Sequence, residues 1–144
     1  MKLILRLAAT NWVNCAAIAA CTYSVGLVGS LLDSGSLYDR LMVGIFGSIF
    51  LLIYYGSIFW LGFVACMVVL DMAGLLFLDI ANRLNSRTGL SFFLGIESML
   101  ISAPFIYWAV KENYYLWYGL VTAFWLSQFL IRLPKMHHIV LKDS

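Results

Sequence analysis

The chain has 144 residues, of which 63% are hydrophobic and only 11% are charged, and its formal net charge is +2. A soluble domain of this size could not bury so much apolar surface, because small folds keep a high ratio of surface to volume. The small net charge and the scattered basic residues also argue against a nucleic-acid-binding protein. We therefore expect a single integral membrane domain over residues 1–144, with the lipid bilayer as its solvent.

The first predicted span covers about residues 7–32, which carry no charge. A helix needs roughly 20 apolar residues to cross the hydrocarbon core of a bilayer. Small residues recur at every fourth position of this stretch, so they share one face on which a second helix can approach closely. This predicted helix-packing face consists of Ala16, Ala20 and Ser24.

The second predicted span covers about residues 41–66, within an uncharged stretch that continues to Leu70. At about 1.5 Å per residue this stretch is longer than the hydrocarbon core, so the helix must tilt or emerge from the membrane. Charged residues then appear among apolar ones at helical spacing over residues 71–87. This pattern predicts a short amphipathic segment at the membrane surface, in which Asp71 is solvated.

The third and fourth predicted spans cover about residues 88–110 and 114–131, and so short a connection predicts an antiparallel hairpin. Small and hydroxyl side chains on the third span predict a second helix-packing face. That face consists of Ser91, Gly95, Ser98 and Ser102. The expected fold class is therefore an all-α membrane protein, a four-transmembrane-helix antiparallel bundle with the short amphipathic segment between its second and third helices.

Lysine and arginine predict the sidedness of this bundle. Seven basic residues fall on one side of the four spans, and only Arg40 and Lys111 fall on the other. Because cytoplasmic loops carry the excess of basic residues, we expect both termini in the cytoplasm, most simply at a bacterial inner membrane. The seven residues are Lys2, Arg6, Arg83, Arg87, Arg132, Lys135 and Lys142.

Glu97 is the most informative residue for function. It lies about ten residues into the third span, roughly 15 Å deep by helix rise and close to the bilayer centre. An acid at that depth is costly in lipid, so it should face the bundle interior and find a partner. The sequence offers no basic residue at matching depth, since Arg132 is expected near the inner membrane surface. We therefore predict that Glu97 is protonated at neutral pH and donates a hydrogen bond.

The candidate intramembrane polar site joins Glu97 to uncharged polar residues of the other three spans. Its remaining members, expected as hydrogen-bond acceptors or matched to Glu97 in depth, are Asn11, Asn14, Gln128, Tyr54 and Tyr55. Motifs for zinc, phosphate or thiol redox chemistry do not occur in the sequence. We expect no catalytic residue, no metal and no cofactor.

Two functions stay open at this stage. The first is a non-catalytic subunit or partner-binding protein of a membrane complex, of an accessory or an inhibitory, immunity-type kind, which acts through protein–protein interaction. The second is a small oligomeric ion- or proton-coupled transporter or channel that uses Glu97. An enzyme is not expected, because the spans contain none of the recognised catalytic motifs.

Overall fold

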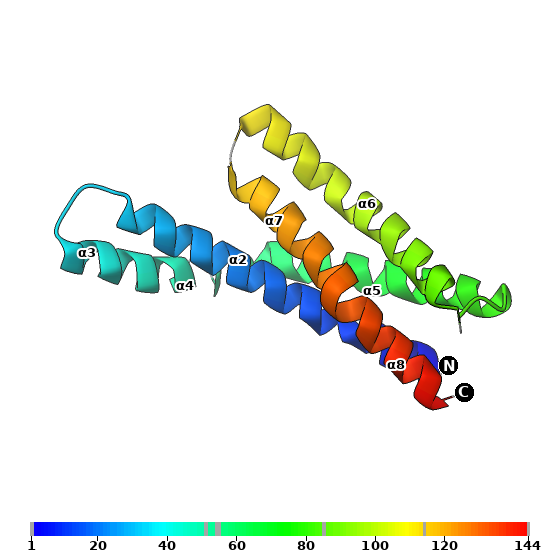
Figure 1. The fold of residues 1–144 in the computed structure, drawn as a ribbon. Coiled ribbons are helices and arrows are strands. Elements are labelled where there is room, and N and C mark those ends of the chain that lie inside the picture. The colour runs from blue at the N-terminus through cyan, green and yellow to red at the C-terminus, as the bar shows by residue number, and fades with distance from the viewer. Residues whose placement is uncertain (1, 51, 54–55, 85, 114, 144) are drawn as a thin grey trace.

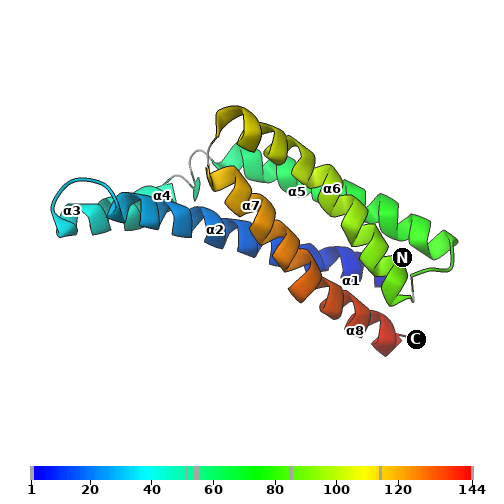
Figure 2. The same ribbon diagram turned by 45° about the horizontal axis from the view of Figure 1, so that its top comes forward.

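The computed structural model of the chain describes residues 2–50, 52–53, 56–84, 86–113 and 115–143, and most of these residues are helical (Figures 1 and 2). Within these described ranges, four stretches of helix are long and apolar enough to cross a membrane. They are Lys2–Leu31, Leu61–Ile80, Arg87–Glu112 and Leu116–Lys142. The prediction of an all-α integral membrane protein with four spanning helices is therefore confirmed.

The first spanning helix is regular except at one turn. It consists of α1 (Lys2–Ala8), a tighter 3₁₀ turn η1 (Ala9–Asn11) and α2 (Trp12–Leu31). Its start lies beside the C-terminal helix, so both termini are at the same end of the molecule (Figure 1).

A short helix follows the first span and folds back along it. It contains α3 (Leu37–Met42), the wider π-helical turn η2 (Val43–Gly47) and α4 (Ser48–Phe50). The side chain of Ser36 caps α3 by accepting a hydrogen bond from the backbone N–H of Asp39. Such a cap satisfies one of the N–H groups that a helix start leaves without a partner.

The short helix and the end of α2 form a hairpin, residues 25–50, which we call the arm. A Cβ atom added at Gly26 would collide with the hydroxyl of Ser48, and one added at Gly44 would collide with that of Ser30. The two contacts are four residues apart on each helix, as antiparallel pairing requires. Glycine at both positions allows this close approach, because a Cβ atom there would require the facing serine side chain to shift. The arm extends away from the other spans in both views (Figures 1 and 2).

The second spanning helix differs from the sequence prediction in its position. It is α5 (Gly56–Ile80), whereas we expected the span at residues 41–66 and a separate amphipathic segment at 71–87. The segment has to be corrected, because residues 71–80 continue the spanning helix. The physical reason is that Asp71, whose charge suggested an exit from the membrane, is completely buried inside the bundle.

The last two spans form the predicted antiparallel hairpin. The third is α6 (Arg87–Glu112), and the fourth comprises α7 (Tyr115–Leu126), a π-helical turn η4 (Ser127–Arg132) and α8 (Leu133–Asp143). The fourth helix therefore runs well past residue 131, where we expected it to end. The fourth span packs against both the third and the first spanning helices.

Buried apolar residues form two separate clusters along the bundle. The cluster near the termini includes Ile4, Leu7, Leu75, Leu90, Leu94, Met136 and Val140. The cluster farther from the termini includes Ile18, Phe63, Met67, Ile101, Phe105, Leu120 and Phe124. On α5, Asp71 lies between Met67 of one cluster and Leu75 of the other. A layer that contains buried polar residues such as Asp71 therefore separates the two apolar clusters.

Candidate functional site

A buried layer of polar side chains crosses the bundle between the two apolar clusters. Every spanning helix contributes to it, and none of its members is more than 6% exposed. We call this set the polar layer, and it consists of Thr10, Asn11, Asn14, Asp71, Glu97, Ser127, Gln128 and Arg132. By helix rise the layer lies about 15 Å from the end of the bundle that carries both termini.

Arg132 is the centre of the polar layer. Its Nη2 lies 2.5 Å from Oδ1 of Asp71, and its Nη1 lies 2.9 Å from Oε2 of Glu97. The same Nη1 donates to Oε1 of Gln128 at 3.0 Å, and Nε donates to the hydroxyl of Thr10 at 3.1 Å. The planar fork of a guanidinium suits this role, because it directs several N–H groups in fixed directions. One side chain therefore connects all four spans.

The two carboxylates of the layer are satisfied to different degrees. Both oxygens of Asp71 accept hydrogen bonds, one from Arg132 and the other from the amide of Asn11. Oε2 of Glu97 accepts from Arg132 and, at 3.1 Å, from Nε2 of Gln128. Oε1 of Glu97 is buried and has no hydrogen-bond partner among the described residues. An unsatisfied buried acceptor costs about 1–3 kcal/mol, so this atom is the weak point of the layer.

A chain of hydrogen bonds extends the layer between the first and fourth spans. Nδ2 of Asn14 donates to Oδ1 of Asn11 at 2.6 Å, and the hydroxyl of Ser127 donates to Oδ1 of Asn14 at 2.7 Å. Each buried amide thus has partners on two sides. Satisfied networks of this kind favour one packing arrangement over others, because any slip would leave polar groups unpaired in a medium of low polarity.

Two irregular helical turns carry much of the polar layer. The 3₁₀ turn η1 holds Thr10 and Asn11, and the π-helical turn η4 holds Ser127, Gln128 and Arg132. Pro134 follows η4 and has no N–H to donate to the preceding turn, which favours a local departure from α-helical geometry. Single π-helical turns within helices are frequent at functional sites.

The structure brings four of the predicted site residues together. Glu97, Asn11, Asn14 and Gln128 all belong to the polar layer. Gln128 contacts Glu97 as expected, but its amide donates and the carboxylate accepts. The two asparagines bond to Asp71, to Ser127 and to each other. The protonation of Glu97 stays a prediction. Tyr54 and Tyr55 lie outside the described residues.

Two expectations about charge were wrong. Glu97 is paired with a basic residue, because the fourth helix continues into α8 and places the guanidinium of Arg132 inside the bundle instead of at its surface. Asp71 is not solvated, because the same guanidinium reaches it. The sequence contains one signal that could have revealed this pairing: Gln128 and Arg132 are four residues apart, so on a helix they share a face.

The two predicted helix-packing faces have different outcomes. On the first span, Ala16, Ala20 and Ser24 are exposed, so this face does not pack within the described chain. On the third span, Ser98 and Ser102 are buried, and Ser102 accepts a hydrogen bond of 2.9 Å from the indole N–H of Trp125. Ser91 and Gly95 are half-buried, and a Cβ atom added at Gly95 would meet nothing within 4 Å.

Comparison with known proteins adds no family or fold relative, because no family model, curated protein or solved structure matches the chain. Within the described ranges, no group of three or more histidine, cysteine, aspartate or glutamate side chains could hold a metal ion. The chemistry on which a function can be argued is therefore that of the polar layer and of the exposed arm.

Proposed function

We propose that this protein is a non-catalytic subunit that binds another membrane protein, as an accessory or inhibitory component of a complex. The observation that carries the proposal is the arm. It extends away from the bundle and carries large apolar side chains on its outer surfaces. Those more than half exposed are Val28, Leu32, Leu37, Tyr38, Val43, Phe46 and Phe50.

The build of the arm supports a role in binding. Its two helices pack closely through Gly26 and Gly44, so the hairpin is formed before any partner arrives. At its tip, Nη1 of Arg40 donates to the backbone carbonyl of Leu31 at 2.9 Å, which further fixes the turn. A preformed surface loses less conformational entropy on association than a flexible one.

The side chains on the arm also suit a protein partner. Tyr38 and Phe46 are 68% and 63% exposed, and aromatic residues are enriched in protein interfaces. The polar layer, by contrast, directs its hydrogen bonds to members of the same chain. An internal role for the layer and an external role for the arm together describe a rigid subunit with one binding surface.

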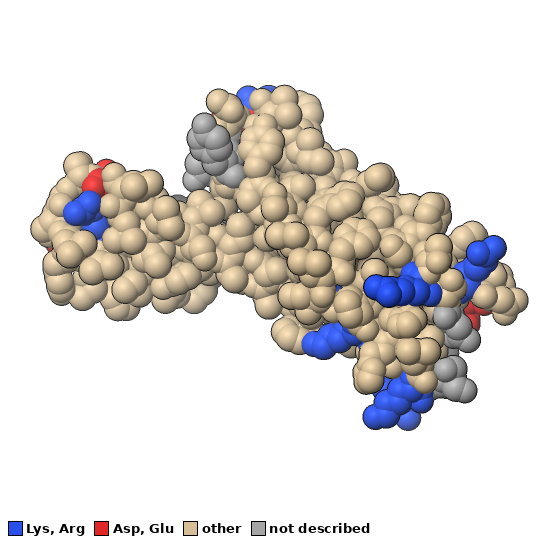
Figure 3. Space-filling view, in the orientation of Figure 1, with Lys and Arg blue, Asp and Glu red and all other residues tan. Residues whose placement is uncertain are grey.

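We also propose that both termini face the cytoplasm, at a bacterial inner membrane. Basic side chains gather at the end of the molecule where the termini lie (Figure 3). Arg132 no longer counts toward this asymmetry, because it is buried in the polar layer. The six basic residues that still count toward the cytoplasmic side outnumber Arg40 and Lys111 at the far ends of the hairpins, which agrees with the rule that positive residues stay inside.

Affinity purification of the tagged full chain in mild detergent tests the partner proposal. We expect a stoichiometric, non-identical membrane protein that co-purifies with the chain. Replacing Tyr38 and Phe46 by alanine should release it. The matched controls, Met99→Ala and Leu130→Ala, remove equally exposed side chains from the bundle and should retain it. A chain that purifies free of other proteins, or release by the control substitutions as well, would contradict the proposal.

The transporter alternative has one specific observation in its favour. With both carboxylates ionised, the charges of Asp71, Glu97 and Arg132 sum to −1, and the buried Oε1 of Glu97 has no hydrogen-bond partner among the described residues. In that case the purified chain should be a self-oligomer and should carry proton or cation flux in liposomes. The flux should disappear in Glu97→Gln and persist after Tyr38 and Phe46 are replaced by alanine.

A further inference from the structure

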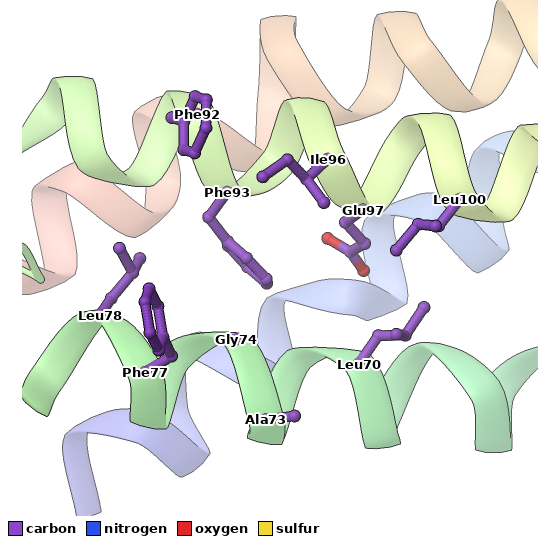
Figure 4. Close-up of a pocket in the computed structure, with 10 residues that line it drawn as sticks. All are labelled: Leu70, Ala73, Gly74, Phe77, Leu78, Phe92, Phe93, Ile96, Glu97 and Leu100. Carbon is purple, nitrogen blue, oxygen red and sulfur yellow. The ribbon is translucent and has the colours of Figure 1, made fainter.

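A half-open groove of about 340 Å³ runs between α5 and α6, and we call it the α5–α6 groove. Its wall is apolar except for Glu97, whose carboxylate is bonded within the polar layer. Phe77 and Phe92 of this wall are 71% and 69% exposed, so the groove is open to the surrounding lipid (Figure 4). The lining residues are Leu70, Ala73, Gly74, Phe77, Leu78, Phe92, Phe93, Ile96, Glu97 and Leu100.

The length of the groove is close to the depth of one leaflet of a bilayer. On α6 it extends from Phe92 to Leu100, which is about 12 Å by helix rise. The hydrocarbon core is about 30 Å thick, so one leaflet supplies roughly half of it. The deep end is at Leu70 and Leu100, and the shallow end is at Leu78 and Phe92, toward the connection between the two helices (Figure 4). An acyl chain that enters from the membrane surface therefore has room along the groove.

Arg83 lies at the shallow end of the groove. A Cβ atom added at Gly89 would lie 3.2 Å from the Cβ of Arg83, so Arg83 packs against the first turn of α6 where that turn has no side chain. Gly89 is three residues before Phe92 and four before Phe93, so it belongs to the face of α6 that lines the groove. Arg87 is in the same first turn. Two arginines therefore lie at the level where a chain in the groove would carry its headgroup.

The charge at this end of the groove selects the headgroup. Arg83 and Arg87 are exposed, and neither forms an ion pair with Asp79 or with any other described residue. A guanidinium suits phosphate because its planar fork donates two parallel hydrogen bonds. A zwitterionic headgroup brings a cation that competes with the arginines, whereas an anionic headgroup does not. Each basic residue near the membrane surface favours an anionic lipid by about fivefold.

We propose that the α5–α6 groove binds an anionic phospholipid, with an acyl chain along the apolar wall and the phosphate on Arg83 and Arg87. A lipid in this position fills the space that the side chains of α5 and α6 leave open. The arm is not part of this site, so the proposal goes beyond the partner-binding function and does not depend on it.

Photolabelling of the full chain in phosphatidylcholine nanodiscs tests this site. The probes, added at low mole fraction, are phosphatidylglycerol and phosphatidylcholine with identical acyl chains that carry a diazirine. Mass spectrometry identifies the labelled residues. We expect phosphatidylglycerol to label the groove with about 25-fold higher apparent affinity, and Arg83→Gln and Arg87→Gln should each lower this preference about fivefold. Lys111→Gln removes an exposed cation from the other end of α6 and should leave the preference unchanged.

A second pair of variants separates the groove from a general attraction of anionic lipid to the basic end of the molecule. Ala73→Trp fills the groove and keeps both arginines, and it should abolish labelling of the groove residues. Ala103→Trp places the same ring on an exposed position of α6 that does not line the groove, and it should label like the wild type.

Three results would overturn the proposal. The first is equal labelling by the two lipids in the wild type, and the second is groove labelling that survives Ala73→Trp. The third is a groove that neither lipid labels in the wild type, as expected if a second copy of the chain or another protein covers it.

Discussion

The arm and the polar layer join helices by different physical means. In the arm, two helices meet because Gly26 and Gly44 allow their backbones to approach closely. In the polar layer, the helices are joined by a guanidinium, two carboxylates and several amides and hydroxyls. Lipid offers no hydrophobic driving force between helices, so close packing and hydrogen bonding are the two means that remain.

The difference has consequences for what each region tolerates. Close packing in the arm depends on the shape of the two helices. A larger side chain at the contact therefore disrupts the packing, whereas a change of charge elsewhere on the arm does not. The polar layer depends on complementary groups, so it fails when one partner is removed and the others stay buried. The arm also exposes much of its surface, whereas the layer exposes almost none. The first region is therefore suited to binding and the second to holding the bundle in one arrangement.

The largest effect is expected from removing the central cation. Arg132→Met should lower the free energy of unfolding by about 3–5 kcal/mol, because it leaves the carboxyl groups of Asp71 and Glu97 buried without the guanidinium that they share. Denaturant unfolding in mild detergent measures this change. Lys142→Met removes an exposed cation from α8 and is the matched control. If the two variants were equally stable, the polar layer would not be what holds the bundle together.

A smaller effect is expected from overpacking within the bundle. A Cβ atom at Gly74 would collide with the ring of Phe93, so Gly74→Ala should cost about 1–3 kcal/mol of unfolding free energy. Gly95→Ala adds the same methyl group where nothing lies within 4 Å, and it should be nearly neutral. Phe93→Leu should rescue part of the loss in the double variant. A failure of this rescue would show that the collision is not the cause.

An arm-specific change should separate the two regions. Gly26→Leu should open the hairpin, because a side chain there meets Ser48, while Gly29→Leu faces open space and should not. Spin labels at the exposed residues Val28 and Val43 report the distance across the arm. We expect a longer distance only in Gly26→Leu, with the unfolding of the bundle unchanged to within about 0.5 kcal/mol. If Gly26→Leu also lowered the unfolding free energy of the bundle, the arm and the bundle would form one cooperative unit.

The smallest effect is expected at the edge of the polar layer. Ser127→Ala removes the hydroxyl that donates to Asn14, but Asn14 keeps its bond to Asn11. Single hydrogen bonds between membrane helices contribute about 0.6 kcal/mol on average, and the loss of unfolding free energy should be of that order. Thr122→Ala, which removes an exposed hydroxyl bonded to its own helix, should have no measurable effect. A loss of several kcal/mol at Ser127 would mean that the layer acts as one unit.

The sequence by itself predicted the helices and part of the polar layer. The positions of charged and polar residues along the chain predict three features. They are the four spans, the hairpin of α6 and α7, and the shared depth of Glu97, Asn11, Asn14 and Gln128. These features could be predicted because a bilayer imposes a fixed length on each helix, and every backbone group in lipid must bond within its own helix. Length and hydropathy are local properties, so a single sequence contains them.

Only the tertiary structure decided how the charges pair and where the second span begins. Asp71 and Arg132 are 61 residues apart in the chain. From the sequence, both were expected at the membrane surface, whereas in the structure they pair inside the bundle. The pairing depends on the direction of the Arg132 side chain at a π-helical turn, and the arm depends on the contact of Gly26 and Gly44 with serines of the facing helix. Whether a charged side chain can lie within the membrane depends on which groups surround it in space. The hydropathy of the sequence does not show which groups those are.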